Sequence, residues 1–259
     1  MAEPTITPDG APRMRAITVS RQYGSGGGEI ARLLAEKLGW RLVDHEVVVR
    51  VAHELGVSQE EAEAQDERTE SLITRLLAGM SLAYPNEGTE LAASPEARAT
   101  LYHQALRRVV EAAADEGNVV IVGRASQVVL AQRRDVFHAR LVAPLELRVL
   151  YVSRREGLSP QQARDRVNRK DQDRNKSLQS RFHRHPDEAS LYDLTVNTGV
   201  LTLGDAVDLI RDALERKGRR LAQPESELGP AAGMRPYEGQ PGDMPPTTQS
   251  EPLVERSES

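Results

Sequence analysis

The sequence predicts an α/β fold in which a five-stranded parallel sheet is covered by helices on both faces. Two observations support this prediction. Five short apolar runs of the length of buried strands occur along the chain. Segments with apolar residues at helical spacing, or with helix-capping motifs, lie between these runs. Alternation of this kind is typical of parallel sheets, because each parallel connection has to cross the sheet.

The predicted strands cover residues 16–20, 40–43, 118–122, 136–142 and 193–197. Between the first two, apolar residues at helical spacing predict a helix over 29–38. Ser94 and Pro95 begin a helix that runs to about residue 116. Capping boxes that start at Ser58, Ser159 and Thr202 begin further helices. The interval 62–100 also reads as largely helical and polar.

The composition excludes several classes of function. The 259 residues contain no cysteine, which rules out disulfides, cysteine-ligated zinc and thiol catalysis. There is no apolar run of about 18 residues for a membrane span, and the N-terminus has no secretory pattern. We therefore expect a cytoplasmic protein without a membrane partner.

Charge is distributed unevenly along the chain. Residues 223–259 contain seven acidic and two basic residues, which gives this tail alone the net charge of −5 that the whole chain carries. The remainder is near neutral, so no general affinity for nucleic acid is expected. We predict a disordered arm over 1–14, a folded domain over 15–217 and a disordered, acidic, proline-rich tail over 218–259.

A glycine-rich turn follows the first predicted strand and opens the first helix, at Gly24, Ser25, Gly26, Gly27 and Gly28. Such a turn lets a phosphate approach the backbone closely, and the amides and the helix dipole attract the anion. Yet the lysine and the Ser/Thr of the nucleotide-binding pattern G-x-x-x-x-G-K-[ST] are both missing, and Gly27 stands in place of the lysine.

Two other interpretations of the turn remain open. Gly24 and Gly26 fit the dinucleotide pattern G-x-G-x-x-G, although Glu29 replaces its third glycine. Asp44 then lies about 20 residues further on, where that fold keeps the acid that binds ribose. The turn could also be purely structural.

Longer strings decide between these interpretations. In order along the chain they are ITVSRQYGSGGGEIARLLAEKLG, RLVDHEVVVR, VVIVGRASQVVL, FHARLVAP, VNRKDQDRNK and YDLTVNTGVLTLGDAVDLI. This series resembles the cytidylate kinase-like family of P-loop kinases, over roughly residues 16–214. The resemblance implies a three-layer sandwich of the P-loop kinase type, with a helical acceptor-binding insertion over 46–102 and a lid over 157–186.

The resemblance also implies roles for individual residues. Asp44 and Arg50 match the start of the region that binds the nucleoside monophosphate, and Arg124 matches an arginine that contacts the bound monophosphate. Arg169 and Lys176 match basic positions of the lid that reach phosphates, and Asp173 matches an aspartate that holds the ribose. The loop around the ATP phosphates corresponds to Gly24, Ser25, Gly26, Gly27, Gly28 and Glu29.

The resemblance therefore implies a phosphotransferase that uses ATP and Mg²⁺, with CMP or dCMP as the first choice of acceptor. Arg124, Arg169 and Lys176 would be catalytic, and no metal site made by side chains is expected. Small kinases of this kind are often monomers, and we expect a monomer that binds small-molecule nucleotides.

The sequence departs from the family pattern in the loop around the ATP phosphates and at one position after VGR. Relatives usually read GSGGREIA, and their arginine is Gly28 here. The aspartate that follows VGR in true cytidylate kinases is Ala125. A pseudokinase that binds nucleotide and regulates a partner is therefore the alternative function, whereas the basic string RKDQDRNK argues against a dinucleotide-binding protein.

Overall fold

The computed structural model describes residues 13–44 and 95–229. Arg50, the capping box at Ser58 and the predicted insertion up to residue 94 lie outside the described residues. The chain divides into two compact units, 1–222 and 223–259. In the second unit, a single 3₁₀ turn, η3 (Glu225–Glu227), is described. The first unit contains the sheet and its covering helices.

The sheet has five parallel strands in the order β2-β3-β1-β4-β5. Each predicted strand agrees with the observed one to within one residue at either end. The order differs from the 3-2-1-4-5-6 arrangement of dinucleotide-binding folds. The strands are β1 (Ala16–Arg21), β2 (Arg41–Val43), β3 (Val119–Val122), β4 (Val136–Val142) and β5 (Leu194–Asn197).

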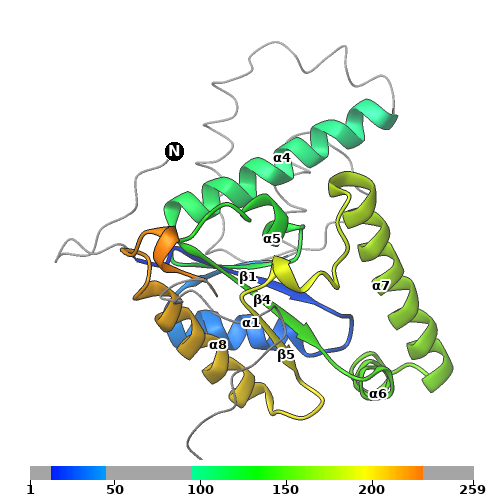
Figure 1. Ribbon diagram of the computed structural model, residues 1–259. Helices are drawn as coiled ribbons and strands as arrows, with labels where there is room; N and C mark the ends of the chain where they lie inside the picture. The colour runs from blue at the N-terminus through cyan, green and yellow to red at the C-terminus, as the bar shows by residue number, and fades with distance from the viewer. Residues whose placement is uncertain (1–12, 45–94, 230–259) are drawn as a thin grey trace, which may run out of the picture. The chain divides into compact units, whose positions relative to one another are not determined.

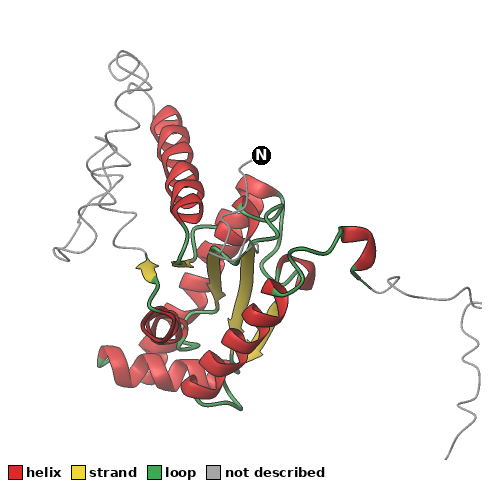
Figure 2. Cartoon of the chain, turned by 90° about the vertical axis from the view of Figure 1, so that its left-hand side faces the viewer, coloured by secondary structure: helices red, strands yellow, loops and turns green. Residues whose placement is uncertain are grey.

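Helices cover both faces of the sheet and complete the predicted three layers (Figure 1). On one face, α1 (Gly27–Leu38) packs beside α8 (Leu203–Gly218). On the other, α4 (Pro95–Glu116) and the short α5 (Ser126–Val129) contact β3 and β1. In the turned view of Figure 2, the strands lie between helices. Each face of the sheet has its own apolar cluster. Strand β3 contributes to both, because its four residues are all buried and alternate residues point to opposite faces.

Two more helices, α6 (Leu145–Glu156) and α7 (Pro160–Phe182), pack on each other near the tips of the β1 and β4 arrows in Figure 1. The capping boxes predicted at Ser159 and Thr202 both form. No prediction covered α6, because the residue before it is Pro144, which offers no side-chain cap. In the described ranges, no helix is long and apolar enough to cross a membrane.

The structure corrects both predicted ends of the folded domain. Met14, assigned above to a disordered arm, is buried in the cluster between the sheet and the α1/α8 layer. Leu221, assigned to the tail, packs against the same cluster, and Arg134 donates a hydrogen bond to the carbonyl oxygen of Arg220 at 3.1 Å. The domain therefore begins before residue 15 and continues beyond 217, because apolar side chains at both ends complete its core.

A polar group lies inside the sheet at His138 of β4, which is only 6% exposed. Its Nδ1 atom is 2.7 Å from the Oγ1 atom of Thr18 on the neighbouring strand β1. Burial lowers the pKa of His138 to about 4, although the charge of Asp193 acts in the opposite direction. The imidazole is therefore neutral in the folded protein at neutral pH.

This depressed pKa predicts a loss of stability in mild acid. An unfolded chain takes up the His138 proton near pH 6.5, whereas the folded chain resists until about pH 4. Between these values the unfolded state binds more protons, so the free energy of unfolding falls as the pH falls, by up to about 3 kcal/mol for this group. Urea unfolding from pH 7 to pH 4 should show a shallower decline in a His138→Gln variant. Parallel profiles for the two proteins would contradict the assignment.

Candidate functional site

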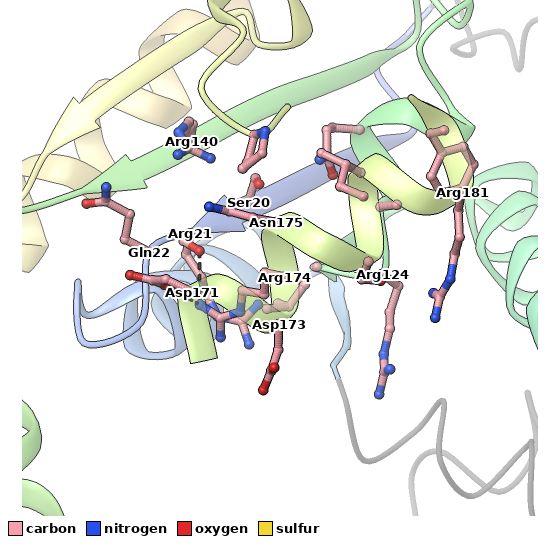
Figure 3. A pocket seen from close by; sticks show the side chains of 18 of the residues that line it. Ser20, Arg21, Gln22, Arg124, Arg140, Asp171, Asp173, Arg174, Asn175 and Arg181 are labelled. Carbon is pink, nitrogen blue, oxygen red and sulfur yellow. Dashed lines mark hydrogen bonds and ion pairs between the residues drawn. The ribbon is translucent and has the colours of Figure 1, made fainter. Parts of the chain in front are cut away.

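A cavity of about 520 Å³ opens at the carboxyl ends of β1 and β3, between the sheet and α7. The segment Ser20, Arg21 and Gln22 reaches it from β1, and Gly123 and Arg124 reach it from β3. Figure 3 shows side chains from these loops and from α7 gathered in the same space. The carboxyl edge is where open parallel sheets bind their ligands.

The cavity has a strongly cationic lining. Among the described residues, its basic members outnumber its acidic ones. The basic residues are Arg21, Arg107, Arg124, Arg140, Lys170, Arg174 and Arg181, and the acidic ones are Asp171, Asp173 and Asp187. Guanidinium groups bind phosphate through paired, charge-assisted hydrogen bonds. The lining therefore favours a phosphorylated ligand.

The glycine turn begins two residues after Gln22, which lines this cavity, and it has a fixed shape. Gly24 has φ +83°, and a Cβ atom there would lie 2.8 Å from the carbonyl oxygen of Arg148. Gly26 has φ +75°, and its Cβ would lie 2.8 Å from the side chain of Leu203. Gly26 is also the N-cap of α1 and supplies no side-chain hydrogen bond to the first amides of that helix. The first amides of α1 thus have no side-chain cap, which suits an anion site, and Gly28 is exposed while Ser25, Gly26 and Gly27 are buried.

Arg148 of α6 holds the start of the glycine turn in place through its side chain. This buried side chain donates to the carbonyl oxygens of Ala143 (2.9 Å) and Tyr23 (3.1 Å). It also forms an ion pair of 2.5 Å with Asp171 of α7. The other carboxylate oxygen of Asp171 accepts a hydrogen bond of 2.8 Å from the amide of Tyr23. One ion pair therefore joins the glycine turn to α6 and α7.

A second contact between α7 and the turn comes from Arg174. Its Nη1 atom donates to the carbonyl oxygen of Arg21 at 3.1 Å, and its guanidinium lies over the ring of Tyr23 at 5.4 Å. Burial lowers the pKa of Arg174, while the charge of Asp171 raises it. The hydroxyl of Tyr23 in turn donates to Glu156 at 2.6 Å. These contacts hold the middle of α7 against the end of β1.

The turn after β3 has positive φ angles at three consecutive residues, two of which are not glycine. Gly123, Arg124 and Ala125 have φ values of +73°, +60° and +55°. Two adjacent non-glycine residues in the left-handed region are uncommon and cost free energy, so the surrounding structure must hold them there. Both residues line the cavity. Strain of this kind clusters at binding sites, which supports a role for Arg124 in the cavity.

Arg140 of β4 extends the cationic lining along the sheet. Its side chain is buried, pairs with Asp187 and lies 5.3 Å from the ring of Tyr192. The hydroxyl of Tyr192 accepts a hydrogen bond of 3.2 Å from Arg140. These contacts orient the guanidinium while leaving it in the lining of the cavity.

The structure brings only some of the predicted site residues together. Arg124 and Asp173 line the cavity, and Asp44 follows β2, from where its charge acts on Arg21. Arg169 and Lys176 are exposed on α7 and are absent from the lining. Glu29, at the first turn of α1, forms an ion pair with Arg155 of α6.

Sequence reasoning missed the residues that tie α7 to the turn, although a signal was present. The buried residues Val167 and Leu178 define the inner face of α7. Asp171 and Arg174 lie at helical spacing between them, so they belong to that face. Arg169 and Lys176 do not follow this spacing. Arg21 and Arg140 were missed because they sit at the end of one strand and inside another, where the sequence shows apolar runs.

Comparisons with known proteins show what this chain is similar to. A cytidylate kinase of Methanopyrus kandleri is 26% identical over 210 residues, which cover 77% of this chain and 92% of that enzyme. A uronate isomerase of Corynebacterium glutamicum is 30% identical over 156 residues, but this chain spans only 30% of its length. An uncharacterized protein from Eubacterium ventriosum has a similar fold, with a TM-score of 0.52 at 19% identity, over 78% of this chain and 99% of that one.

The model of the cytidylate kinase-like family matches residues 16–200, which include the whole sheet, the glycine turn and α7. The matched range contains every described residue that lines the cavity. This chain therefore belongs to the cytidylate kinase-like family.

Proposed function

We propose that this protein is a phosphotransferase that moves the γ-phosphate of ATP to a nucleoside monophosphate, with CMP or dCMP as the first choice. The observation that carries the proposal is the cationic cavity beside a glycine turn at the carboxyl edge of a P-loop kinase sheet. Similarity to a cytidylate kinase supports the choice of base. The protein would act as a cytoplasmic monomer on small-molecule nucleotides.

Two neighbouring binding sites would hold the two substrates, ATP and the acceptor. The amides at the start of α1 and the glycine turn would hold the ATP phosphates, because this helix end carries no side-chain cap. The cavity would hold the acceptor, with Arg124 and Arg140 on its phosphate and Asp173 near its sugar. Arg21 and Gln22 belong to both places, since they lead from β1 into the turn and also line the cavity. The γ-phosphate would therefore pass across the end of β1.

The reaction needs positioned charge more than covalent help. An oxygen of the acceptor phosphate forms a bond to the γ-phosphorus as the bond between that phosphorus and the bridging oxygen breaks, which gives ADP and a nucleoside diphosphate. The arginines would stabilise charge on the transferring group, an effect worth roughly 3–4 kcal/mol for one well-placed donor. Magnesium bound with ATP would neutralise charge on the β- and γ-phosphates.

Helix α7 would act as the lid over the substrates. Lys170 and Arg174 already line the cavity, so we assign the phosphate-binding role of the lid to them. The catalytic roles of Arg169 and Lys176 stay a prediction, which would require α7 to turn as it closes. Such closure is the usual way in which kinases exclude water from the reaction.

The test is ADP release from MgATP with CMP, dCMP, UMP, AMP and GMP as acceptors. We expect release that depends on the acceptor, and a loss of about 100-fold or more in kcat/KM in an Arg124→Ala variant. Arg216→Ala is the matched control, because Arg216 is exposed on α8 and pairs with Asp212, one turn earlier in the same helix. Equal activity of Arg124→Ala and the control would contradict the assignment of the cavity.

A pseudokinase is the second candidate, and one observation favours it. Gly27 and Gly28 leave the first turn of α1 without the lysine and the hydroxyl that a phosphate loop normally provides. In that case the protein would bind nucleotide and show no ADP release with any acceptor. Calorimetric titration with a non-hydrolysable ATP analogue separates this outcome from an absence of binding.

A further inference from the structure

The glycine turn carries an exchange of residues that the structure explains. When Gly26 is taken as the second glycine of G-x-x-x-x-G-K-[ST], the first glycine is replaced by Arg21 and the lysine by Gly27. A cation has therefore appeared at one end of the motif and disappeared from the other. Gly28, the next residue, also has no side chain, so the start of α1 offers no cation of its own.

These two positions touch each other in space. A Cβ atom added to Gly27 would lie 2.6 Å from Cδ and 2.9 Å from Cβ of Arg21. Real Cβ atoms do not approach other atoms this closely, so the stem of Arg21 occupies the volume in which a side chain at position 27 would begin. Position 27 is glycine because Arg21 lies over it.

The guanidinium of Arg21 ends between the two proposed phosphate sites. Its Nη1 atom would be 3.2 Å from a Cβ atom built on Gly123, the residue that precedes Arg124. The side chain thus crosses from the start of α1 to the end of β3. Arg21, Arg124 and Arg174 all line the cavity, and Figure 3 shows Arg21 beside Arg174. A phosphoryl group that travels from the glycine turn to Arg124 would pass this guanidinium.

The charges around Arg21 also favour binding of an anion. Burial, together with the charges of Arg174 and Arg124, lowers the pKa of Arg21 to about 10, and Asp44 opposes this effect. At neutral pH the group is still protonated. Clustered, partly desolvated cations are costly unless a negative group joins them. A bound polyphosphate would supply that charge.

We propose that Arg21 is the phosphate-loop cation of this protein and replaces the missing lysine from the opposite end of the motif. This inference rests on the proposed function, and it names the residue that would contact the transferring phosphate. Arg21 would donate hydrogen bonds to the γ-phosphate before and during transfer and would keep its own proton throughout. Its planar guanidinium can bind two phosphate oxygens at once, which a lysine cannot do.

The test moves the cation back to its usual place. Arg21→Gly is expected to weaken binding of a non-hydrolysable ATP analogue by about 10- to 100-fold and to lower kcat by about 100-fold or more. Gly27→Lys alone should also bind the analogue weakly and have a low kcat, because the new side chain collides with Arg21. The double variant Arg21→Gly/Gly27→Lys restores the first glycine and the lysine of the standard pattern and should recover most of both losses.

The matched control is Arg21→Gly/Gly27→Ala, which relieves the same collision without adding a charge and should remain as impaired as Arg21→Gly. The proposal is overturned if Arg21→Gly/Gly27→Ala recovers as much binding and turnover as Arg21→Gly/Gly27→Lys. It is also overturned if Arg21→Gly binds the analogue as tightly as the wild type. Arg21→Met keeps the stem over Gly27 and covers the case in which the glycine variants do not fold. It should bind as weakly as Arg21→Gly, and wild-type binding by it would also overturn the proposal.

Binding and turnover separate this inference from the proposed function. If the wild-type protein binds the ATP analogue but transfers no phosphate, the proposed function fails and the binding series still decides the role of Arg21. If the wild-type protein does not bind the analogue, both fail. If the analogue binds, phosphate is transferred and Arg21→Met keeps wild-type values of both, then only the inference about Arg21 fails.

Discussion

Replacing Arg148 with methionine is expected to destabilise the domain by about 3 kcal/mol and to remove nucleotide binding with it. The guanidinium of Arg148 is buried. It donates hydrogen bonds to the carbonyl oxygens of Ala143 and Tyr23 and forms an ion pair with Asp171. Methionine fills similar volume, but it leaves Asp171 with the more distant Arg174 (3.6 Å) in place of its close ion pair and takes one donor from each of two carbonyl groups. Urea unfolding measures the first effect, and calorimetry with an ATP analogue measures the second.

The two helices offer a matched control for this variant. Arg164 of α7 pairs with Glu146 of α6 at 2.5 Å, so it joins the same helices as Arg148 and Asp171, but at an exposed position. Exposed ion pairs contribute about 0–1 kcal/mol. Arg164→Met should therefore unfold almost as the wild type does. Equal losses in the two variants would show that burial of Arg148 is not what makes its contacts important.

Replacing Gly24 with alanine is expected to lower kcat/KM by about 100-fold or more, because a small displacement of catalytic groups has effects of this size. The φ angle of +83° is unfavourable for alanine, and the new Cβ would lie 2.8 Å from the backbone oxygen of Arg148 and 2.9 Å from Val152. Since a backbone atom cannot move aside as a flexible side chain can, the turn itself must shift. Steady-state kinetics with MgATP and the preferred acceptor measures the loss.

Gly28→Ala tests whether this effect depends on position. Gly28 lies four residues away in the same turn and helix start, and nothing lies within 4 Å of a Cβ atom added there. Alanine also favours helix over glycine, by about 1 kcal/mol in a helix interior. This variant should keep or gain stability, and its loss of kcat/KM should be much smaller than that of Gly24→Ala. A loss equal to that of Gly24→Ala would contradict the packing explanation.

Most of the fold could be predicted from the sequence because its signals are local. Buried strands appear as short apolar runs, and capping boxes at Ser159 and Thr202 mark helix starts through contacts between residues three apart. The ends of the domain were harder, because Met14 and Leu221 join the core through contacts with distant parts of the chain. Strand order also depends on distant pairing, and no local pattern encodes it.

The site was predictable only where one element supplies a whole motif. The glycine turn could be found from its residues, and Arg124 from the resemblance to the kinase family. The ion pair between Arg148 and Asp171 joins two helices, one of which the sequence did not reveal. Arg21 was missed because its side chain acts on a glycine that lies six positions further on, and only the folded turn brings them into contact.

The hydrogen bond from the Tyr23 amide to Asp171 makes that single amide a reporter of helix position. It is a bond of 2.8 Å between a backbone group of the turn and a side chain of α7. When α7 lifts, the amide loses its acceptor and meets water, whereas the strand amides of β1 stay paired with β3 and β4. Hydrogen–deuterium exchange at Tyr23, relative to the amides of β1, thus measures how often α7 moves away from the turn, without any label attached to the protein.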